Sequence, residues 1–164
     1  MVLGMSLAAF TTLHVLISIA ALLLGIAFVV TLLQGKEVPS VTGLFLLFTI
    51  ATSATGFLFP ADTLLPSHIT GIISLVVLAA ASVARFTFRL AGHWRLIFIV
   101  TAIMSFYLNA FVFVVQAFLK VPNLHDLAPT GAEPPFAAAQ GVVLVAFVGL
   151  GFLAVRRFHP RAVG

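Results

Sequence analysis

Long stretches without one charged side chain are the feature that most limits what this chain can fold into. No Asp, Glu, Lys or Arg occurs in residues 1–34, 96–119 or 134–155, and between residues 37 and 85 only Asp62 is charged. A helix rises about 1.5 Å per residue, so roughly 20 apolar residues cross the hydrocarbon core of a bilayer. The pattern predicts an all-α integral membrane protein.

The composition excludes a water-soluble alternative. Hydrophobic residues make up 62% of the 164 residues and charged residues 7%, whereas soluble domains carry about 25% charged residues. A small soluble fold exposes too much of its surface to hide this many apolar side chains. We therefore expect residues 1–164 to form a single membrane domain. Because the chain has no cysteine, disulfides and thiolate metal sites are excluded.

Five membrane spans are predicted, at residues 8–33, 40–60, 66–85, 96–119 and 135–155. All eight prolines lie at or outside the ends of these segments, where the missing N–H of proline costs little. The first span has no basic residues before it and no Ala-x-Ala-like site before Lys36. It therefore favours a permanent span over a cleaved signal peptide.

The basic residues predict the orientation. When the five spans are threaded through a bilayer, seven of the eight Lys and Arg residues fall on one side: Lys36, Arg85, Arg89, Arg95, Arg156, Arg157 and Arg161. The positive-inside rule makes that side cytoplasmic, with the N-terminus outside and the C-terminus inside a bacterial-type cell membrane. These residues flank spans instead of forming a stripe, so we expect the lipid bilayer as a partner and no nucleic acid.

Polar side chains inside the spans fall on particular helix faces. In the fourth span, an arc of about 100° holds Thr101, Ser105, Asn109, Gln116 and Lys120. Small or polar residues of other spans that could share this interior are Ser18, Gly71 and Gln140. Helix packing accounts for most serine, threonine and glycine positions. The carboxamides of Asn109 and Gln116 favour a polar pocket or pathway, because each has four hydrogen-bonding positions to satisfy.

Two histidines are predicted at the same depth. Counting about 20 residues outward from the basic side reaches His14 in the first span, a point just outside His68 in the third, and Gln116 in the fourth. One hypothesis is a haem b held between His14 and His68, with Ser18 and Gly71 one turn below giving room for the macrocycle. Membrane electron transfer would then be the activity, with a redox protein as partner. The sequence contains no cytochrome-specific motif, and local hydrogen bonding or helix capping by the two histidines is the alternative.

Other interpretations of this histidine layer stay open. A metal site could use His14, His68 and His125 with nearby carboxylates, although no metal-binding spacing is present. The stripe of the fourth span could instead line a conduit for protons or a small solute, with the histidines as relay groups. A non-catalytic subunit of a membrane complex, or a homo-oligomer, remains a further alternative. Motifs of soluble enzymes are missing, so we do not expect catalysis.

The longest connection, residues 120–134, is predicted to lie outside. Four prolines in residues 121–135 indicate a stiff segment without helix. We interpret it as a lid over the histidines that carries His125, Asp126 and Glu133; an ordinary interfacial connector is the alternative. Glu133 precedes Pro134 and suits the positive end of the last span.

Overall fold

The computed structural model describes residues 2–61, 63 and 66–159. Their regular structure is helical, apart from one isolated bridge between Val2 and Met5. The elements are α1 (Leu7–Leu33), α2 (Pro39–Gly56), α3 (Pro66–Ser82), the π-helix η1 (Val83–Thr87), α4 (Trp94–Lys120), α5 (Pro122–Leu127) and α6 (Pro134–Arg157). Five helical segments are long and apolar enough to cross a membrane: α1, α2, α3 with η1, α4 and α6. The prediction of an all-helical chain with five such segments is confirmed.

Local sequence explains where the helices begin. The hydroxyl of Ser6 accepts a hydrogen bond from the Ala9 amide at 3.2 Å and so caps α1, as serine commonly does at this position. Pro39, Pro66 and Pro134 each occupy the first position of a helix, where proline loses no intrahelical hydrogen bond. The predicted positions of these three starts are therefore correct to within one residue.

The prediction for the connection between the fourth and fifth spans, α4 and α6, is wrong in one respect. Residues 122–127 form the short helix α5, although four nearby prolines indicated a segment without helix. Pro122 stands at the start of α5, where its missing N–H is not needed. The carbonyl of Val121 accepts hydrogen bonds from the amides of Leu124 and His125, so one helical turn closes directly behind α4.

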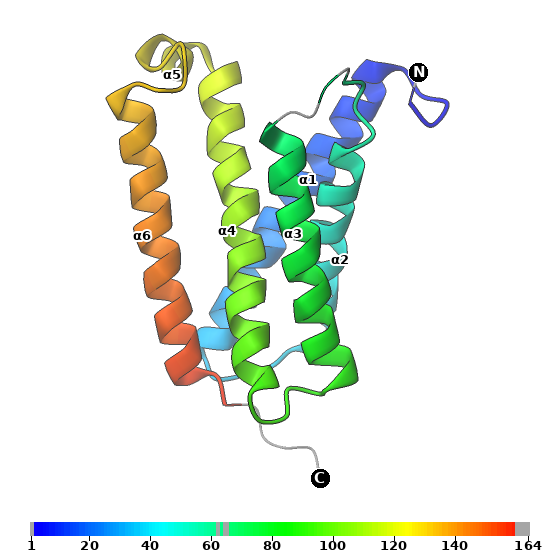
Figure 1. Ribbon diagram of the computed structural model, residues 1–164, viewed down its shortest axis with the longest axis vertical. Helices are drawn as coiled ribbons and strands as arrows, with labels where there is room; N and C mark the ends of the chain where they lie inside the picture. Colours follow the sequence, from blue (N-terminus) through cyan, green and yellow to red (C-terminus); the bar gives the residue numbers. More distant parts are fainter. Residues whose placement is uncertain (1, 62, 64–65, 160–164) are drawn as a thin grey trace.

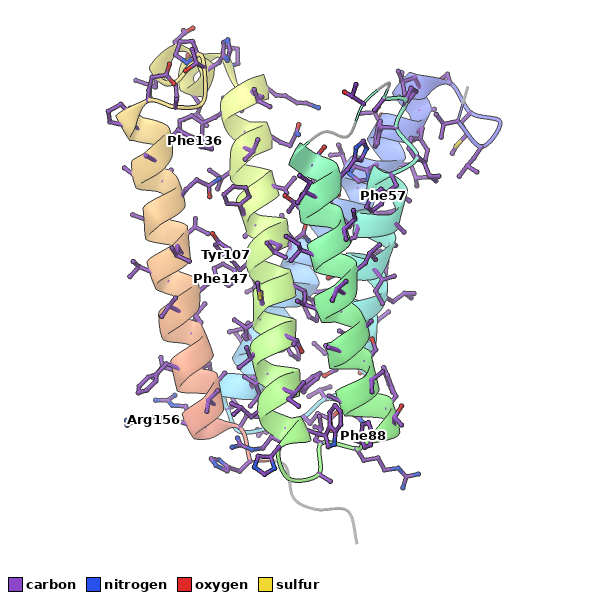
Figure 2. The ribbon with its side chains drawn as sticks, viewed as in Figure 1. Phe57, Phe88, Tyr107, Phe136, Phe147 and Arg156 are labelled. Atoms are coloured by element: carbon purple, nitrogen blue, oxygen red, sulfur yellow. The ribbon has the colours of Figure 1, made fainter. Side chains whose placement is uncertain are left out.

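The five long helices form a bundle around α4 (Figure 1). Helix α4 packs against α3 on one side and α6 on the other, and α1 packs chiefly against α2. Helix α1 crosses obliquely behind α4, so its second half approaches α6 while its first half lies away from α6. The N-terminus and α5 lie at the same end of the bundle, here called the α5 end. The opposite end, called the arginine end, carries Lys36, Arg85, Arg89, Arg95, Arg156 and Arg157; Arg156 is labelled in Figure 2.

The buried core lies in the half of the bundle nearer the arginine end. Its centre is a group of phenylalanines, here called the phenylalanine layer: Phe28, Phe45, Phe98 and Phe106. The rings of Phe28 and Phe45 stack at 4.6 Å, and Phe106 meets the edge of Phe45 at 5.9 Å. Gly25 gives this layer its space, because a Cβ there would lie 2.5 Å from the Phe106 ring. The bundle is therefore densely packed at one end.

Hydrogen bonds and an ion pair connect the helices at the arginine end. Arg95 donates hydrogen bonds to the carbonyls of Val155 at 3.1 Å and Phe158 at 2.5 Å, which ties the end of α6 to the start of α4. Arg85 in η1 forms an ion pair with Glu37 in the loop after α1. These two side chains are only 19% and 18% exposed, so removing one partner would leave the charge of the other poorly solvated.

Candidate functional site

A cavity of about 530 Å³ opens between α1, α2, α3 and α4 toward the α5 end. It is called the histidine cavity below. Most of its wall is apolar. Its polar lining residues come from all four helices: Thr11, His14, Ser18, Thr52, Ser53, Ser67, His68, Thr70, Ser74, Asn109, Gln116 and Lys120. The phenylalanine layer contributes no residue to this lining, so the cavity ends above the densely packed half of the bundle.

A threonine from α2 holds the ring of His14. The Nδ1 atom of His14 lies 2.8 Å from the hydroxyl oxygen of Thr55. That hydroxyl also lies within hydrogen-bond distance of the carbonyls of Ala51 at 2.7 Å and Thr52 at 3.2 Å. The tautomer of His14 decides whether Nδ1 donates to Thr55 or accepts from it. Phe59 meets the His14 ring edge-on at 5.1 Å. The ring of His14 is thus held in the cavity wall by two neighbours.

His68 is held by an aromatic neighbour from the turn after α2. Its ring stacks on Phe57 with a centroid distance of 5.6 Å and an interplanar angle of 16°. Figure 2 shows Phe57 near the α5 end, beside α3. The same Phe57 ring covers Gly71, because a Cβ at Gly71 would lie 2.9 Å from it. Gly71 lines the cavity as expected, but the room that it creates is filled by Phe57.

Helix α4 contributes only part of its predicted polar stripe to the cavity. Asn109, Gln116 and Lys120 line it, and the ammonium of Lys120 lies within electrostatic range of His14. Thr101 and Ser105 do not line it. Their hydroxyls donate to carbonyls of α4 itself, at 2.6 and 2.8 Å, and Ser105 is fully buried in the packed half. The stripe therefore divides into a cavity part and a core part.

The remaining predicted pocket residues satisfy local bonds. Ser18 lines the cavity, but its hydroxyl donates to the His14 carbonyl at 2.7 Å. Gln140 lies outside the lining and links α6 to α4, since its Nε2 donates to the Phe111 carbonyl at 3.1 Å. Tyr107, Phe111 and Phe147 form an aromatic contact between the same two helices. Figure 2 places Tyr107 and Phe147 between α4 and α6. Gln140 therefore belongs to a helix interface.

The predicted lid residues lie outside the cavity lining. His125 and Asp126 are in α5, Glu133 precedes α6, and none of the three lines the cavity. Glu133 accepts hydrogen bonds from the amide and hydroxyl of Thr130 and from the Ala132 amide. Desolvation acts to raise the pKa of Glu133, but these hydrogen bonds outweigh it and hold the pKa below its usual value. Glu133 thus closes the turn before α6.

Two polar atoms in the cavity wall have no hydrogen-bond partner within the described part of the chain. They are Nδ2 of Asn109 and Oγ1 of Thr52, and both are shielded from solvent. Asn109 is among the site residues predicted from the sequence. The roles of Thr55, Phe57 and Phe59 were not predicted. No local pattern marks these residues, because Thr55 contacts a histidine 41 positions away.

A metal centre finds no support among residues 2–61, 63 and 66–159. No three histidine or carboxylate side chains of these residues come together in a way that could hold an ion. The set of His14, His68 and His125 is therefore not assembled. Asp62, one of the carboxylates near these histidines in the predicted layer, lies outside the described residues. Comparisons with protein-family models, curated proteins and solved structures find no match to this chain.

Proposed function

We propose that this chain is an integral membrane protein that binds one small, lipid-soluble molecule in the histidine cavity. The observation that carries the proposal is the cavity itself. Its volume of about 530 Å³ falls within the roughly 300–1,000 Å³ typical of small-molecule sites. Largely apolar walls with a few polar groups from several helices are also typical of such sites.

The proposed orientation places the mouth of the cavity toward the outside of the cell. The arginine end carries Arg85, Arg95 and Arg156 among its basic residues, and cytoplasmic ends of membrane bundles are enriched in Lys and Arg. The α5 end, where Lys120 is the basic residue, would then face outward. A ligand could enter from the outer leaflet, because the mouth lies at the ends of α1 and α4.

A matched pair of glycine substitutions tests the binding proposal. Gly56 lines the cavity, and a Cβ there would meet only the His14 ring, at 3.9 Å. Leucine at this position projects beside the His14 ring and takes up part of the cavity. Gly43 lies on the same helix outside the cavity, with nothing within 4 Å of its added Cβ. Gly43→Leu therefore adds the same side chain without blocking the cavity.

The measurement is thermal unfolding in detergent with and without 2-methylnaphthalene. A ligand that binds only the folded protein raises the unfolding midpoint. We expect the probe to raise the midpoint of the wild type and of Gly43→Leu, and to leave Gly56→Leu unchanged. An unmoved wild type, or equal shifts in all three proteins, would reject the histidine cavity as a binding site.

Haem b is a second, narrower candidate, and the bond between His14 and Thr55 favours it. Histidines that ligate metals usually donate their other ring N–H to a neighbouring acceptor, and the hydroxyl oxygen of Thr55, 2.8 Å from Nδ1 of His14, is placed to be that acceptor. The imidazoles of His14 and His68 would be the residues that hold the group. The group would supply electron transfer, and the outer-facing Lys120 could pair with its carboxylates. Phe57 would have to leave Gly71 if the macrocycle used that space.

Absorbance spectroscopy tests the haem candidate. Purified protein is titrated with haemin in detergent, and a Soret band that saturates at one equivalent is the expected result. His14→Ala and His68→Ala should abolish the band, whereas His93→Ala should keep it, because His93 precedes α4 at the arginine end. Thr55→Val should weaken binding by about 10- to 100-fold, the usual effect of losing a group that orients a ligand. No saturable band in the wild type would end the haem proposal and leave the wider one standing.

A further inference from the structure

The deep end of the histidine cavity contains two side-chain atoms that have no partner among the described residues. Nδ2 of Asn109 in α4 and Oγ1 of Thr52 in α2 are both shielded from solvent. Both residues line the cavity. Folded proteins rarely leave buried polar atoms unpaired, because the lost hydration is then not compensated. The two atoms therefore indicate where a ligand's polar group would be received.

The environment of Thr52 differs from that of its two nearest threonines on α2, Thr49 and Thr55. Thr49 and Thr55 each donate their hydroxyl proton to the carbonyl four residues earlier, both at 2.7 Å. This bond is the usual way for a helical threonine to satisfy its hydroxyl in an apolar setting. The Thr52 hydroxyl makes no such bond. Thr52, a residue of the cavity wall, thus keeps a hydroxyl proton that has no acceptor among the described residues.

The position of Asn109 sets how far a ligand must reach. Asn109 lies eleven residues before Lys120 on α4, which places it about 16 Å along the helix axis from that end. Lys120 and Val121 line the outer part of the cavity. The wall that α4 forms between these levels is mostly apolar, with Val112 and Phe113, and Gln116 is its polar member. A ligand that reaches Asn109 must therefore have an apolar body.

We propose that the ligand is a lipid-soluble carbonyl compound of the quinone type, whose inner carbonyl oxygen accepts hydrogen bonds from Asn109 Nδ2 and Thr52 Oγ1. This inference rests on the proposed function, since it names the ligand class of the same cavity. A carbonyl oxygen has two lone pairs and accepts from both donors without bringing a charge into the membrane. The flat ring lies against the apolar wall, and His14 and Lys120 lie nearer the mouth. If a haem occupied the cavity with its carboxylates at Lys120, its apolar ring would offer no hydrogen-bond acceptor to the side-chain amide of Asn109.

Two probes with the same carbon skeleton test the proposal. Menadione has two ring carbonyls, and 2-methylnaphthalene has the matching carbon skeleton without them. Dissociation constants are measured from the concentration dependence of the unfolding midpoint, in one detergent for all proteins. Asn109→Leu and Thr52→Val each remove one donor while keeping the side-chain volume. Thr42→Val is the matched control, because the hydroxyl of Thr42 is also buried and unpaired but lies outside the cavity.

The expected result is a selective loss of menadione binding. Each cavity variant should weaken menadione about three- to tenfold, the effect of one neutral hydrogen bond, and should leave 2-methylnaphthalene within about twofold. Thr42→Val should change neither constant. If both probes bind the wild type and neither cavity variant weakens menadione selectively, the carbonyl inference is overturned while the binding site stands. If neither probe binds the wild type, the proposed function itself fails.

Discussion

Gly25 offers the sharpest test of how the packed half of the bundle closes the cavity. In Gly25→Ala the new Cβ would lie 2.5 Å from Cε2 of Phe106, whereas carbon atoms in contact prefer about 3.5–4.0 Å. The ring must retreat by about 1 Å to restore that distance. It has little room to do so, because it is only 5% exposed and lies against Phe45 and Phe147, with ring centroids 5.9 and 4.9 Å away.

The expected cost follows from two opposing terms. Overpacking a buried site costs about 1–3 kcal/mol, and alanine stabilises a helix by up to about 1 kcal/mol relative to glycine. Gly149→Ala isolates the second term, because Gly149 lies in α6 with nothing within 4 Å of an added Cβ. The free energy of unfolding of Gly25→Ala should therefore fall about 1–3 kcal/mol below that of Gly149→Ala.

Unfolding by denaturant in mixed micelles measures this difference. A double-mutant cycle with Phe106→Leu adds a second check, since a smaller flexible side chain makes room for the new methyl group. Gly25→Ala should then cost much less in the Phe106→Leu background than in the wild type. Equal stabilities of Gly25→Ala and Gly149→Ala, or no coupling in the cycle, would show that Gly25 is not needed for the space of the Phe106 ring.

Three further predictions concern the ion pair between Glu37 and Arg85, the turn before α6 and the contact of Phe57 with His68. Glu37→Gln should destabilise the protein by about 1.5–3 kcal/mol, because Arg85 then keeps an unpaired charge with little exposure to water. Chemical unfolding measures the loss of free energy. The double variant Glu37→Gln, Arg85→Gln should lose less stability than the sum of the two single variants. Hydrogen bonds lower the pKa of Glu133 in the folded state. Its contribution to stability is therefore present above the pKa that Glu133 has in the unfolded chain, and it is lost as pH falls through the pKa of the folded state. A carboxyl-carbon NMR titration should give a midpoint below the usual one for glutamate, and Glu133→Gln should remove this part of the acid dependence of stability. Gly71→Ala should push Phe57 off the imidazole of His68, since the new Cβ would lie 2.9 Å from the Phe57 ring. The imidazole NMR signals of His68 should then shift. Unchanged signals would contradict this packing.

The positions of the helices were largely predictable because hydropathy and length are local properties. The predicted spans 8–33, 96–119 and 135–155 agree with α1, α4 and α6 to within two residues at each end. The second span was predicted to reach residue 60, but α2 ends at Gly56. Residues 57–59 are apolar yet form a turn, and hydropathy cannot distinguish an apolar turn from helix.

The candidate site was predictable only in outline. Depth and helical phase assigned His14, His68, Asn109, Gln116 and Lys120 to one pocket, and these residues do line one cavity. The contacts that decide what each residue can do depend on crossing angles and on the loop after α2. They include the ring of Phe57 over Gly71 and the bond between His14 and Thr55. Crossing angles follow from how side-chain ridges interlock between helices, which spacing along one helix does not reveal.

The phenylalanine layer also bears on whether the cavity could be the entrance of a conduit. Phe28, Phe45, Phe98 and Phe106 fill the bundle between the cavity and the arginine end. Exposing one of these rings to water costs about 1.5–3 kcal/mol. A path that exposes two of them costs about 3–6 kcal/mol, so the open form would be on the order of one molecule in a hundred or fewer. The physical expectation is a cavity that binds and does not conduct.

Removing one ring should reverse this expectation. Phe106→Ala takes away the side chain that fills the space beside Gly25 and meets Phe45 and Phe147, and it leaves the cavity lining intact. In liposomes loaded with a pH-sensitive dye, the wild type should hold a proton gradient and Phe106→Ala should leak. Phe136→Ala is the control, because Phe136 lies between α4 and α6 near the α5 end, outside the cavity lining. A leak through the wild type that Asn109→Leu abolishes would instead support the conduit, since water would then already pass the layer.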